Sequence, residues 1–274
     1  MSSLFLEASE DVKNSNIVIA GYPYDSTSSF RSGSRKGPNA IREYSWNLET
    51  FSPFTKMDIH TKKYADSGDI ELPFGDTKRA INMIYSNTKK LLKKGKKVIS
   101  LGGEHTVTYP IIKAYSEFYD DFIMIVFDAH ADLRDNYLGV KYSHACAMNL
   151  CSGVIGSKRI CQFGIRSYTK EEYEYSPNML HFSDNLNDFD FNKIKNKRIY
   201  ISIDIDALDS SVVPGTGTPE PGGLFFREFM DFLLKFSNYE VIGCDLVELA
   251  PDYDPSGISA AAASKITREL ILLL

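Results

Sequence analysis

The sequence DAHAD at residues 128–132 carries three potential metal ligands, Asp128, His130 and Asp132, at every second position. It follows the apolar run FIMIVF at 122–127, which is typical of a buried β-strand. Because alternate side chains of an extended backbone point to the same face, the three would converge where the strand ends. The pattern therefore predicts a metal site at that strand end.

Acidic and imidazole side chains also follow three other apolar runs. Parallel sheets bind ligands at the carboxyl ends of their strands, so this placement indicates one shared site. VISLGG at 98–103 leads into Glu104 and His105, ISI at 201–203 into Asp204, Asp206 and Asp209, and VIGC at 241–244 into Asp245 and Glu248.

Two imidazoles and four carboxylates make up the candidate cluster. If they meet, the carboxylates cannot all stay ionised without cations, because like charges raise one another's pKa. Nitrogen and oxygen ligands without thiolate favour manganese over structural zinc, and six ligands suit two ions that share bridging carboxylates. Two such ions would activate a bridging water for hydrolysis. The members are His105, Asp128, His130, Asp132, Asp204 and Asp206. For Asp209 and Asp245 we favour a helix cap or support of the ligands.

Short apolar runs alternate with longer amphipathic stretches along the chain. This alternation predicts a mainly parallel sheet of about eight strands with helices on both faces. The expected strands lie at 17–21, 98–103, 122–128, 160–165, 199–206 and 241–246, with weaker candidates near Tyr64 and at 179–182, and the expected helices at 78–94, 109–119, 224–236 and 257–273. No linker interrupts the pattern, so we expect a single domain over residues 1–274. The Ser/Pro/Gly-biased stretches 25–38 and 210–223 indicate functional loops.

The composition excludes several classes of partner. A formal charge of −5 and a pI near 5.6 argue against nucleic acid or an anionic membrane. The basic run KKLLKKGKK at 89–97 fits the last turn of a helix that stops at Gly95. The four cysteines, Cys146, Cys151, Cys161 and Cys244, lack CxxC spacing, and neither a signal peptide nor a long apolar span is present. We therefore expect a reduced, cytoplasmic protein.

Six motifs in order along the chain resemble those of the ureohydrolases, which include arginases and agmatinases. The resemblance as a whole spans about residues 17–265, nearly the whole chain. The segment FRSGSRKGPNAIR at 30–42 is similar to the agmatinase version of the family's N-terminal region. The motifs are GGEHT at 102–106, DAHAD at 128–132, SHA at 143–145, SIDIDALD at 202–209, PGTGTPEPGG at 214–223 and DLVELAP at 245–251.

The resemblance implies a three-layer αβα fold around an eight-stranded parallel sheet and a site for two Mn²⁺ ions. It places His105 and Asp132 on the first ion, His130 and Asp206 on the second, and Asp128 and Asp204 as bridges. His144 resembles the family's proton shuttle and Glu248 the carboxylate that holds the guanidinium; with Asp132 they are the expected catalytic residues. Glu104 and Ala145 depart from the Asp and Gly found in many relatives, and neither change removes a ligand.

The chemistry of a guanidinium agrees with this assignment. Its charge is spread over three nitrogens, so its carbon is a poor electrophile and needs a strong nucleophile already in place. A hydroxide held by metal would supply one, and Glu248 would pair with the guanidinium nitrogens. His144, with a pKa near its ordinary value, would protonate the departing amine. The expected products are urea and an amine.

The substrate prediction depends on what binds the far end of the guanidino compound. The arginases hold an α-amino acid with a polar Asn/Ser loop and with acids after a GLR-type turn. Here Arg134 stands at the Asn position, and Ser167 to Thr169 contain no acid, although Asn136 and Glu172 remain available for polar contacts. Since a carboxylate without a donor would lose its hydration, we expect agmatine or an N-substituted agmatine.

Several alternatives stay open at this point. Other ureohydrolase substrates are N1-aminopropylagmatine, guanidinobutyrate, arginine and formiminoglutamate. A single-zinc, deacetylase-like hydrolase and a metal-bound regulator without turnover are rivals from other classes. Nucleotide binding is excluded because GxxxxGK[ST] and a helix-opening GxGxxG are both missing. The family resemblance implies a homo-oligomer, a trimer or a hexamer.

Overall fold

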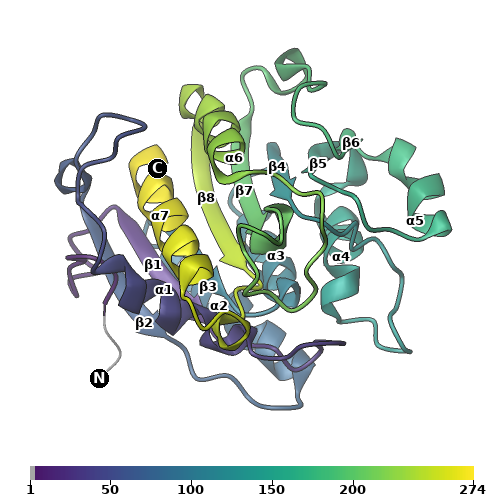
Figure 1. Ribbon diagram of the computed structural model, residues 1–274, viewed down its shortest axis with the longest axis horizontal. Helices are drawn as coiled ribbons and strands as arrows, with labels where there is room; N and C mark the ends of the chain where they lie inside the picture. The colour runs from purple at the N-terminus through teal and green to yellow at the C-terminus, as the bar shows by residue number, and fades with distance from the viewer. Residues whose placement is uncertain (1–3) are drawn as a thin grey trace.

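Eight parallel strands form one sheet in the computed structural model, which describes residues 4–274 (Figure 1). The strand order is β2-β1-β3-β8-β7-β4-β5-β6. The strands are β1 (Ile17–Tyr22), β2 (Tyr64–Asp69), β3 (Lys97–Gly102), β4 (Phe122–Phe127), β5 (Ile160–Phe163), β6 (His181–Ser183), β7 (Arg198–Asp204) and β8 (Glu240–Val247). Both weak strand candidates are present, so the predicted eight-stranded sheet is confirmed.

Helices cover both faces of the sheet, because each crossover between parallel strands must return across one face. The helices are α1 (Gly37–Ser45), α2 (Thr77–Leu92), α3 (Thr108–Tyr115), α4 (Ala147–Ile155), α5 (Lys170–Tyr175), α6 (Phe226–Leu233) and α7 (Ile258–Leu273). Buried side chains of α1, α6 and α7 pack into one core, and those of α2, α3 and α4 pack into the other. This is the predicted three-layer αβα arrangement (Figure 1).

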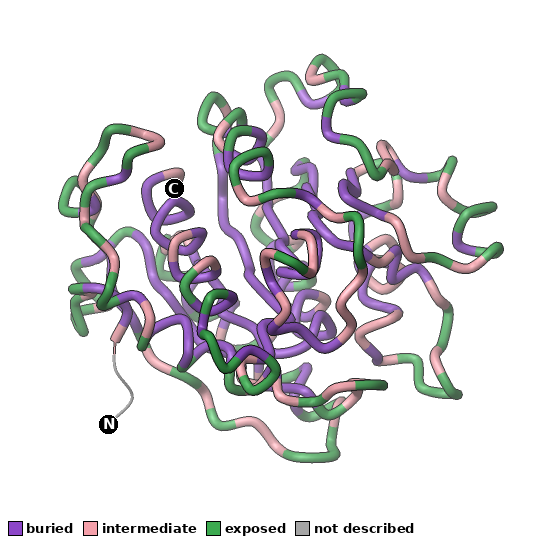
Figure 2. Tube along the Cα trace, viewed as in Figure 1, coloured by how far each residue is buried: buried purple, intermediate pink, exposed green. Residues whose placement is uncertain are grey.

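The central strands are buried on both faces, which explains their continuous apolar sequences. Residues 122–127 of β4, for example, are buried at every position. Figure 2 shows the buried strands in the interior and the exposed segments in the outer loops. A chain with this pattern cannot leave either face of the sheet to solvent, so two helical layers are required.

The predicted helices differ from the observed ones mainly at their ends. The helix expected at 109–119 stops at Tyr115, and the one expected at 224–236 spans only Phe226–Leu233. Helices α1, α4 and α5 were not predicted; each is short, six to nine residues, and offers few helical periods to detect. The basic run does close α2, which ends at Leu92 ahead of Gly95 at φ 69°.

The strand order places four polar strand ends side by side. Strands β3, β8, β7 and β4 are consecutive in the sheet, and these are the four strands that lead into acidic and imidazole residues. Because these strands pair in parallel, their carboxyl ends lie at one edge. The single-domain organisation over residues 1–274 stays a prediction. Within residues 4–274, none of the helices combines the length and the apolar character needed to cross a membrane.

Candidate metal centre

A cavity of about 200 Å³ opens at the carboxyl edge of the sheet. The predicted ligands His130, Asp132 and Asp204 line it, together with His144 and Glu248. The loop after β7 also contributes Thr218, as expected for the Pro-rich stretch 210–223. The cavity therefore joins residues from segments more than a hundred positions apart in the sequence.

The first group of candidate ligands comprises His105, Asp128 and Asp132, all buried. The Nδ1 atom of His105 lies 3.0 Å from Oδ2 of Asp128 and 3.1 Å from Oδ2 of Asp132. His105 opens the turn η3 (His105–Val107) directly after β3, while the two aspartates follow β4. The ends of β3 and β4, which are separated in the sheet by β8 and β7, thus supply one nitrogen and two oxygens around a single point.

The second group comprises Asp128, His130 and Asp206. The Nδ1 atom of His130 lies 3.0 Å from Oδ2 of Asp206 and 3.7 Å from Oδ1 of Asp128. Asp128 belongs to both groups, with Oδ2 toward His105 and Oδ1 toward His130. This division of its two oxygens agrees with the bridging position implied by the family resemblance.

Asp204 borders the first group, with Oδ2 3.4 Å from Nδ1 of His105. Its Oδ1 accepts a hydrogen bond from the backbone N–H of Asp206 at 3.0 Å. Asp206 is not in an extended strand as expected, because β7 ends at Asp204 and the turn η8 (Ile205–Ala207) follows. The bridging role of Asp204 stays a prediction.

Local turns, rather than an extended backbone, bring the DAHAD side chains together. Strand β4 ends at Phe127, and Asp132 has a left-handed φ of 52°. The prediction of simple alternation through Asp132 is therefore wrong, although the predicted convergence is correct. A non-glycine residue in this conformation costs free energy and is held there by its surroundings, a feature that gathers at functional sites.

The buried carboxylates of the cluster repel one another, and bound cations would relieve this repulsion. Burial, together with the negative charges of Asp206 and Asp128, raises the pKa of Asp204 well above its usual range. Burial and the charge of Asp128 raise the pKa of Asp132 to about 6. Burial lowers the pKa of the His130 imidazole, but the neighbouring carboxylates of Asp206 and Asp128 outweigh burial and raise this pKa to about 12. These pKa shifts arise from repulsion among the carboxylates and from attraction between His130 and the carboxylates. Bound cations would reduce the repulsion among the carboxylates.

Two buried atoms of the first group are consistent with a site for a divalent ion. Nδ1 of His105 and Oδ2 of Asp128 are buried without a hydrogen-bond partner, even though they lie 3.0 Å apart. Their mutual geometry is not that of a hydrogen bond, so both atoms keep a lone pair available. Unpaired buried polar atoms are costly, and a metal ion would satisfy both at once.

A buried hydrogen-bond chain supports His105 from behind. Its Nε2 lies 3.2 Å from Oγ of Ser202, and Ser202 donates to Oδ1 of Asp245 at 2.7 Å. Asp245 also accepts from Tyr200 at 2.7 Å and from Thr108 at 3.1 Å. Asp245 therefore supports a candidate ligand and caps no helix. Ser202 was not among the predicted site residues. The sequence feature that could have identified it is its alternation with Asp204 and Asp206 in SIDID.

Asp209 closes the loop beside the cavity and contacts none of the candidate ligands. Its Oδ2 accepts from the backbone N–H groups of Gly222 and Gly223 at 2.7 and 2.8 Å. Its Oδ1 accepts from the backbone N–H of Ser211 at 2.9 Å. These bonds join the two ends of the 209–223 loop, so Asp209 shapes a wall of the site.

Glu248 reaches the cavity from the end of β8. Its backbone has a left-handed φ of 63°, and its N–H donates to the carbonyl of Gly103 at 2.8 Å. Oε1 accepts from the backbone N–H of His105 at 2.7 Å, which leaves Oε2 for a ligand. Burial and the charge of Glu104 raise the pKa of Glu248 well above its usual range. A cationic group in the cavity would stabilise the ionised carboxylate.

His144 also lines the cavity, at the start of the turn η4 (His144–Cys146). Burial lowers its pKa to about 4, so the expectation of an ordinary pKa is wrong. The ring is held by Thr27 and Ser29, two residues of the 25–38 stretch that sequence analysis had assigned only as a functional loop. A neutral imidazole at this position can accept a proton.

The outer wall of the cavity contains Arg134, Tyr137 and Tyr168. The guanidinium of Arg134 stacks over the Tyr137 ring, 4.8 Å from its centroid, and its Nε lies 4.0 Å from Glu172. Glu172 lines the cavity as well, but both of its oxygens accept backbone N–H groups of the wall, Leu133 at 2.9 Å and Thr169 at 2.7 Å. Asn136 lies outside the lining of this cavity and lines an adjacent one.

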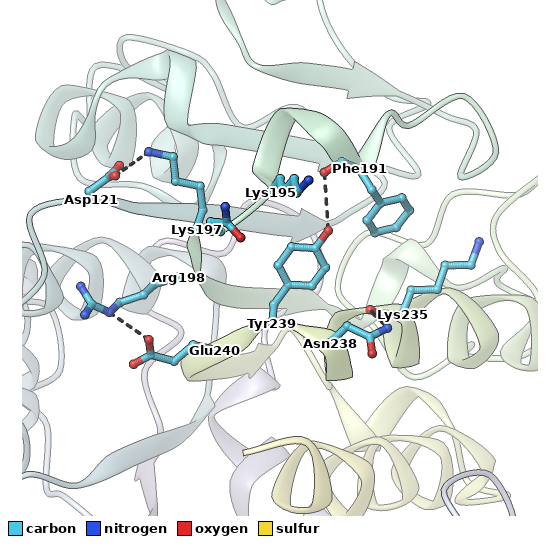
Figure 3. A pocket seen from close by; sticks show the side chains of 10 residues that line it. Asp121, Phe191, Lys195, Lys197, Arg198, Lys235, Asn238, Tyr239 and Glu240 are labelled. Carbon is cyan, nitrogen blue, oxygen red and sulfur yellow. Dashed lines mark hydrogen bonds and ion pairs between the residues drawn. The ribbon is translucent and has the colours of Figure 1, made fainter.

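A larger cavity of about 680 Å³ lies at the amino ends of β7 and β8, away from the cluster (Figure 3). Within it Lys197 pairs with Asp121, and Arg198 pairs with Glu240 at 3.2 Å. Its lining contains no imidazole and no cysteine. The larger cavity is therefore lined by none of the candidate metal ligands.

The fold and the cluster together define the class: an αβα protein with candidate metal ligands at one edge of a parallel sheet. The chain matches the arginase family over residues 15–273. It is 42% identical to an agmatinase of Bacillus anthracis, over 98% of this chain and 95% of that protein. It is 40% identical to an agmatinase of Bacillus subtilis, over 98% and 95% of the two chains.

Solved structures agree with the sequence matches. The agmatine ureohydrolase of Thermoplasma volcanium superposes with a TM-score of 0.90 at 32% identity, covering 99% of this chain and 94% of that one. The proclavaminate amidino hydrolase of Streptomyces clavuligerus superposes with a TM-score of 0.92 at 28% identity, covering 100% and 97%. This chain belongs to the arginase family: it is a ureohydrolase enzyme, and membership favours this class over the deacetylase-like rival.

Proposed function

We propose that this ureohydrolase binds two Mn²⁺ ions and hydrolyses agmatine to urea and putrescine. One observation carries the proposal: two groups of buried imidazole and carboxylate ligands share Asp128 beside a cavity that also contains Glu248 and His144. Such a set suits a binuclear centre, and its nitrogen and oxygen donors suit manganese.

His105, Asp128 and Asp132 would hold one ion, and Asp128, His130 and Asp206 the other, with Asp204 as a second bridge. When bound, the ions supply an activated water nucleophile and positive charge for the transition state. The unpaired Nδ1 of His105 and Oδ2 of Asp128 support this assignment.

The remaining residues act on the substrate. Oε2 of Glu248 pairs with the guanidinium nitrogens and orients the central carbon toward the metal ligands. His144, neutral because burial lowers its pKa to about 4, accepts a proton at Nε2 during attack and then donates it to the departing amine. Both residues lie on the cavity wall beside the cluster.

Agmatine is supported by the agmatinase relatives and by the absence of an acidic residue from Ser167 to Thr169. The α-ammonium of arginine would therefore meet no carboxylate from this turn. Ser167 donates instead to Glu220 at 3.0 Å, so its hydroxyl is already engaged.

One observation favours a second candidate, a guanidino carboxylic acid. The guanidinium of Arg134 lines the cavity, and its side chain makes no hydrogen bond to the described residues, so it offers a fork of donors to a carboxylate. A substrate carboxylate in this cavity would therefore have Arg134 as a donor. Hydrolysis of 4-guanidinobutyrate is the simplest test of this second candidate.

The decisive experiment measures urea release by the purified, manganese-loaded protein. Agmatine, arginine, 4-guanidinobutyrate, aminopropylagmatine and formiminoglutamate are compared at one Mn²⁺ concentration. We expect kcat/KM for agmatine to exceed that for arginine by about 10² or more. Equal values or an arginine preference would reject the agmatine assignment, and a guanidinobutyrate preference would select the second candidate.

We further propose a homo-oligomer, a trimer or a hexamer as the family resemblance implies, and a reduced cytoplasmic location. The location is supported by four cysteines that are all free and buried. Sedimentation of the purified protein tests the oligomer.

A further inference from the structure

One loop holds both ring nitrogens of His144. The Oγ1 atom of Thr27 lies 3.4 Å from Nδ1 and accepts the backbone N–H of His144 at 3.1 Å. The Oγ atom of Ser29 lies 3.2 Å from Nε2. Ser29 also lines the reactive cavity, so Nε2 is the ring atom that faces the substrate.

Behind this loop lies Glu104, a fully buried carboxylate outside the candidate ligand set. Its Oε2 accepts the backbone N–H of Thr27 at 2.7 Å, and its Oε1 accepts the Thr27 hydroxyl at 2.5 Å. A weaker contact joins Ser28 to Oε2 at 3.4 Å. Glu104 therefore clamps the loop to the end of β3, next to the first candidate ligand.

The direction of the Thr27 hydroxyl determines the protonation of the His144 ring. A hydroxyl has one proton to donate, and the 2.5 Å bond to Oε1 of Glu104 is much shorter than the 3.3 Å contact to Thr106 or the 3.4 Å contact to Nδ1. Thr27 thus faces Nδ1 as an acceptor. The Oγ atom of Ser143 lies farther from Nδ1, at 3.5 Å, so the contact with Thr27 favours a ring proton on Nδ1, while Nε2 keeps its lone pair.

We propose that Glu104 and Thr27 are positioning residues that hold neutral His144 as the Nδ1–H tautomer, so that Nε2 is the proton-accepting atom in the cavity. This inference rests on the proposed function, in which Nε2 takes a proton from the attacking water and returns it to the leaving amine. In the resting state Ser29 donates its hydroxyl proton to Nε2.

Two substitutions test the chain of contacts. Thr27→Val keeps the shape but removes the hydroxyl, and Thr27→Ser is the matched control that retains it. Glu104→Gln is expected to reverse the direction of the hydrogen bond between residue 104 and the Thr27 hydroxyl. An amide N–H that donates to Thr27 Oγ1 would turn the hydroxyl proton toward Nδ1, and this would favour the Nε2–H tautomer.

The direct readout is the ¹⁵N chemical shift of the two His144 nitrogens, with diamagnetic Zn²⁺ in place of Mn²⁺ and His144→Asn to assign the signals. We expect a protonated Nδ1 and an unprotonated Nε2 in the wild type and in Thr27→Ser. Glu104→Gln should show the opposite tautomer, and Thr27→Val a mixture of both.

Kinetics of the manganese form supply the second readout. Thr27→Val and Glu104→Gln should lower kcat by about 10- to 100-fold with little change in KM, less than the loss of a general acid–base group itself. Thr27→Ser should stay within about threefold. A wild-type tautomer in both Thr27→Val and Glu104→Gln would overturn the proposal. If the wild type released no urea from any guanidino substrate, the proposed function would fail while the chemical shifts still decided the tautomer.

Discussion

His105 Nε2 lies 3.2 Å from the hydroxyl of Ser202, which donates its own proton to Asp245. Ser202 must therefore accept from Nε2–H, so the neutral form of the His105 ring directs the lone pair of Nδ1 toward Asp128 and Asp132. Outer hydrogen bonds of this kind fix the tautomer of a ligating histidine.

Replacing Ser202 with alanine should weaken metal binding by about 10- to 100-fold without removing any candidate ligand. Manganese titration by calorimetry measures the effect, and Ser237→Ala, at an exposed position, is the matched control. Wild-type affinity in Ser202→Ala would show that the chain behind His105 does not tune the site.

Removing the metals should destabilise the fold as well as stop the reaction. The carboxylates of Asp128, Asp132 and Asp204 meet in the interior, and ions that bind only the native state add about 2.7 kcal/mol of stability at a hundredfold excess over Kd. Thermal melts of the chelator-treated and manganese-loaded protein provide the measurement. Identical melting temperatures would contradict the proposed cluster.

Asp128→Asn should bring the metal content below two ions per chain, because Asp128 is the residue shared by both ligand groups. Elemental analysis after dialysis against metal-free buffer gives the count. Asp209→Asn is a suitable control, since Asp209 bonds only to its own loop. Two retained ions in Asp128→Asn would exclude the bridging role.

The buried His144 should make stability depend on pH in a defined window. Its folded-state pKa of about 4 lies below the unfolded value of 6.5, so the unfolded state binds the proton first as the pH falls. Stability is thus complete above pH 6.5 and decreases toward pH 4, by up to about 3 kcal/mol. The difference in unfolding free energy between the wild type and His144→Asn, followed by urea denaturation, isolates this contribution. A difference independent of pH would be the contrary result.

Glu248→Gln should weaken guanidinium capture while both metals stay bound. Loss of one partner of a buried, hydrogen-bonded charge pair costs about 2–5 kcal/mol, so kcat/KM for agmatine should fall by at least about 30-fold. The amide still accepts the backbone N–H of His105, which keeps the strand ends together. Loss of metal in this variant would place Glu248 among the ligands instead.

The sequence by itself determined the elements and the chemical character of the site. The apolar runs before Asp128, Asp204 and Glu248 predicted buried strands because side-chain burial is encoded locally, by periodicity and by the turn residues that follow. The ligand types at these strand ends then indicated metal chemistry before any contact was known.

Only the tertiary structure decided which strand ends are neighbours and which other residues reach them. Thr27 meets His144 across 117 residues, and Ser202 joins His105 to Asp245 from a separate strand. The left-handed backbone of Asp132 and Glu248 is likewise imposed by the surrounding packing. Local periodicity carries no information about strand order or long-range approach, because these depend on how both helical layers close over the whole sheet.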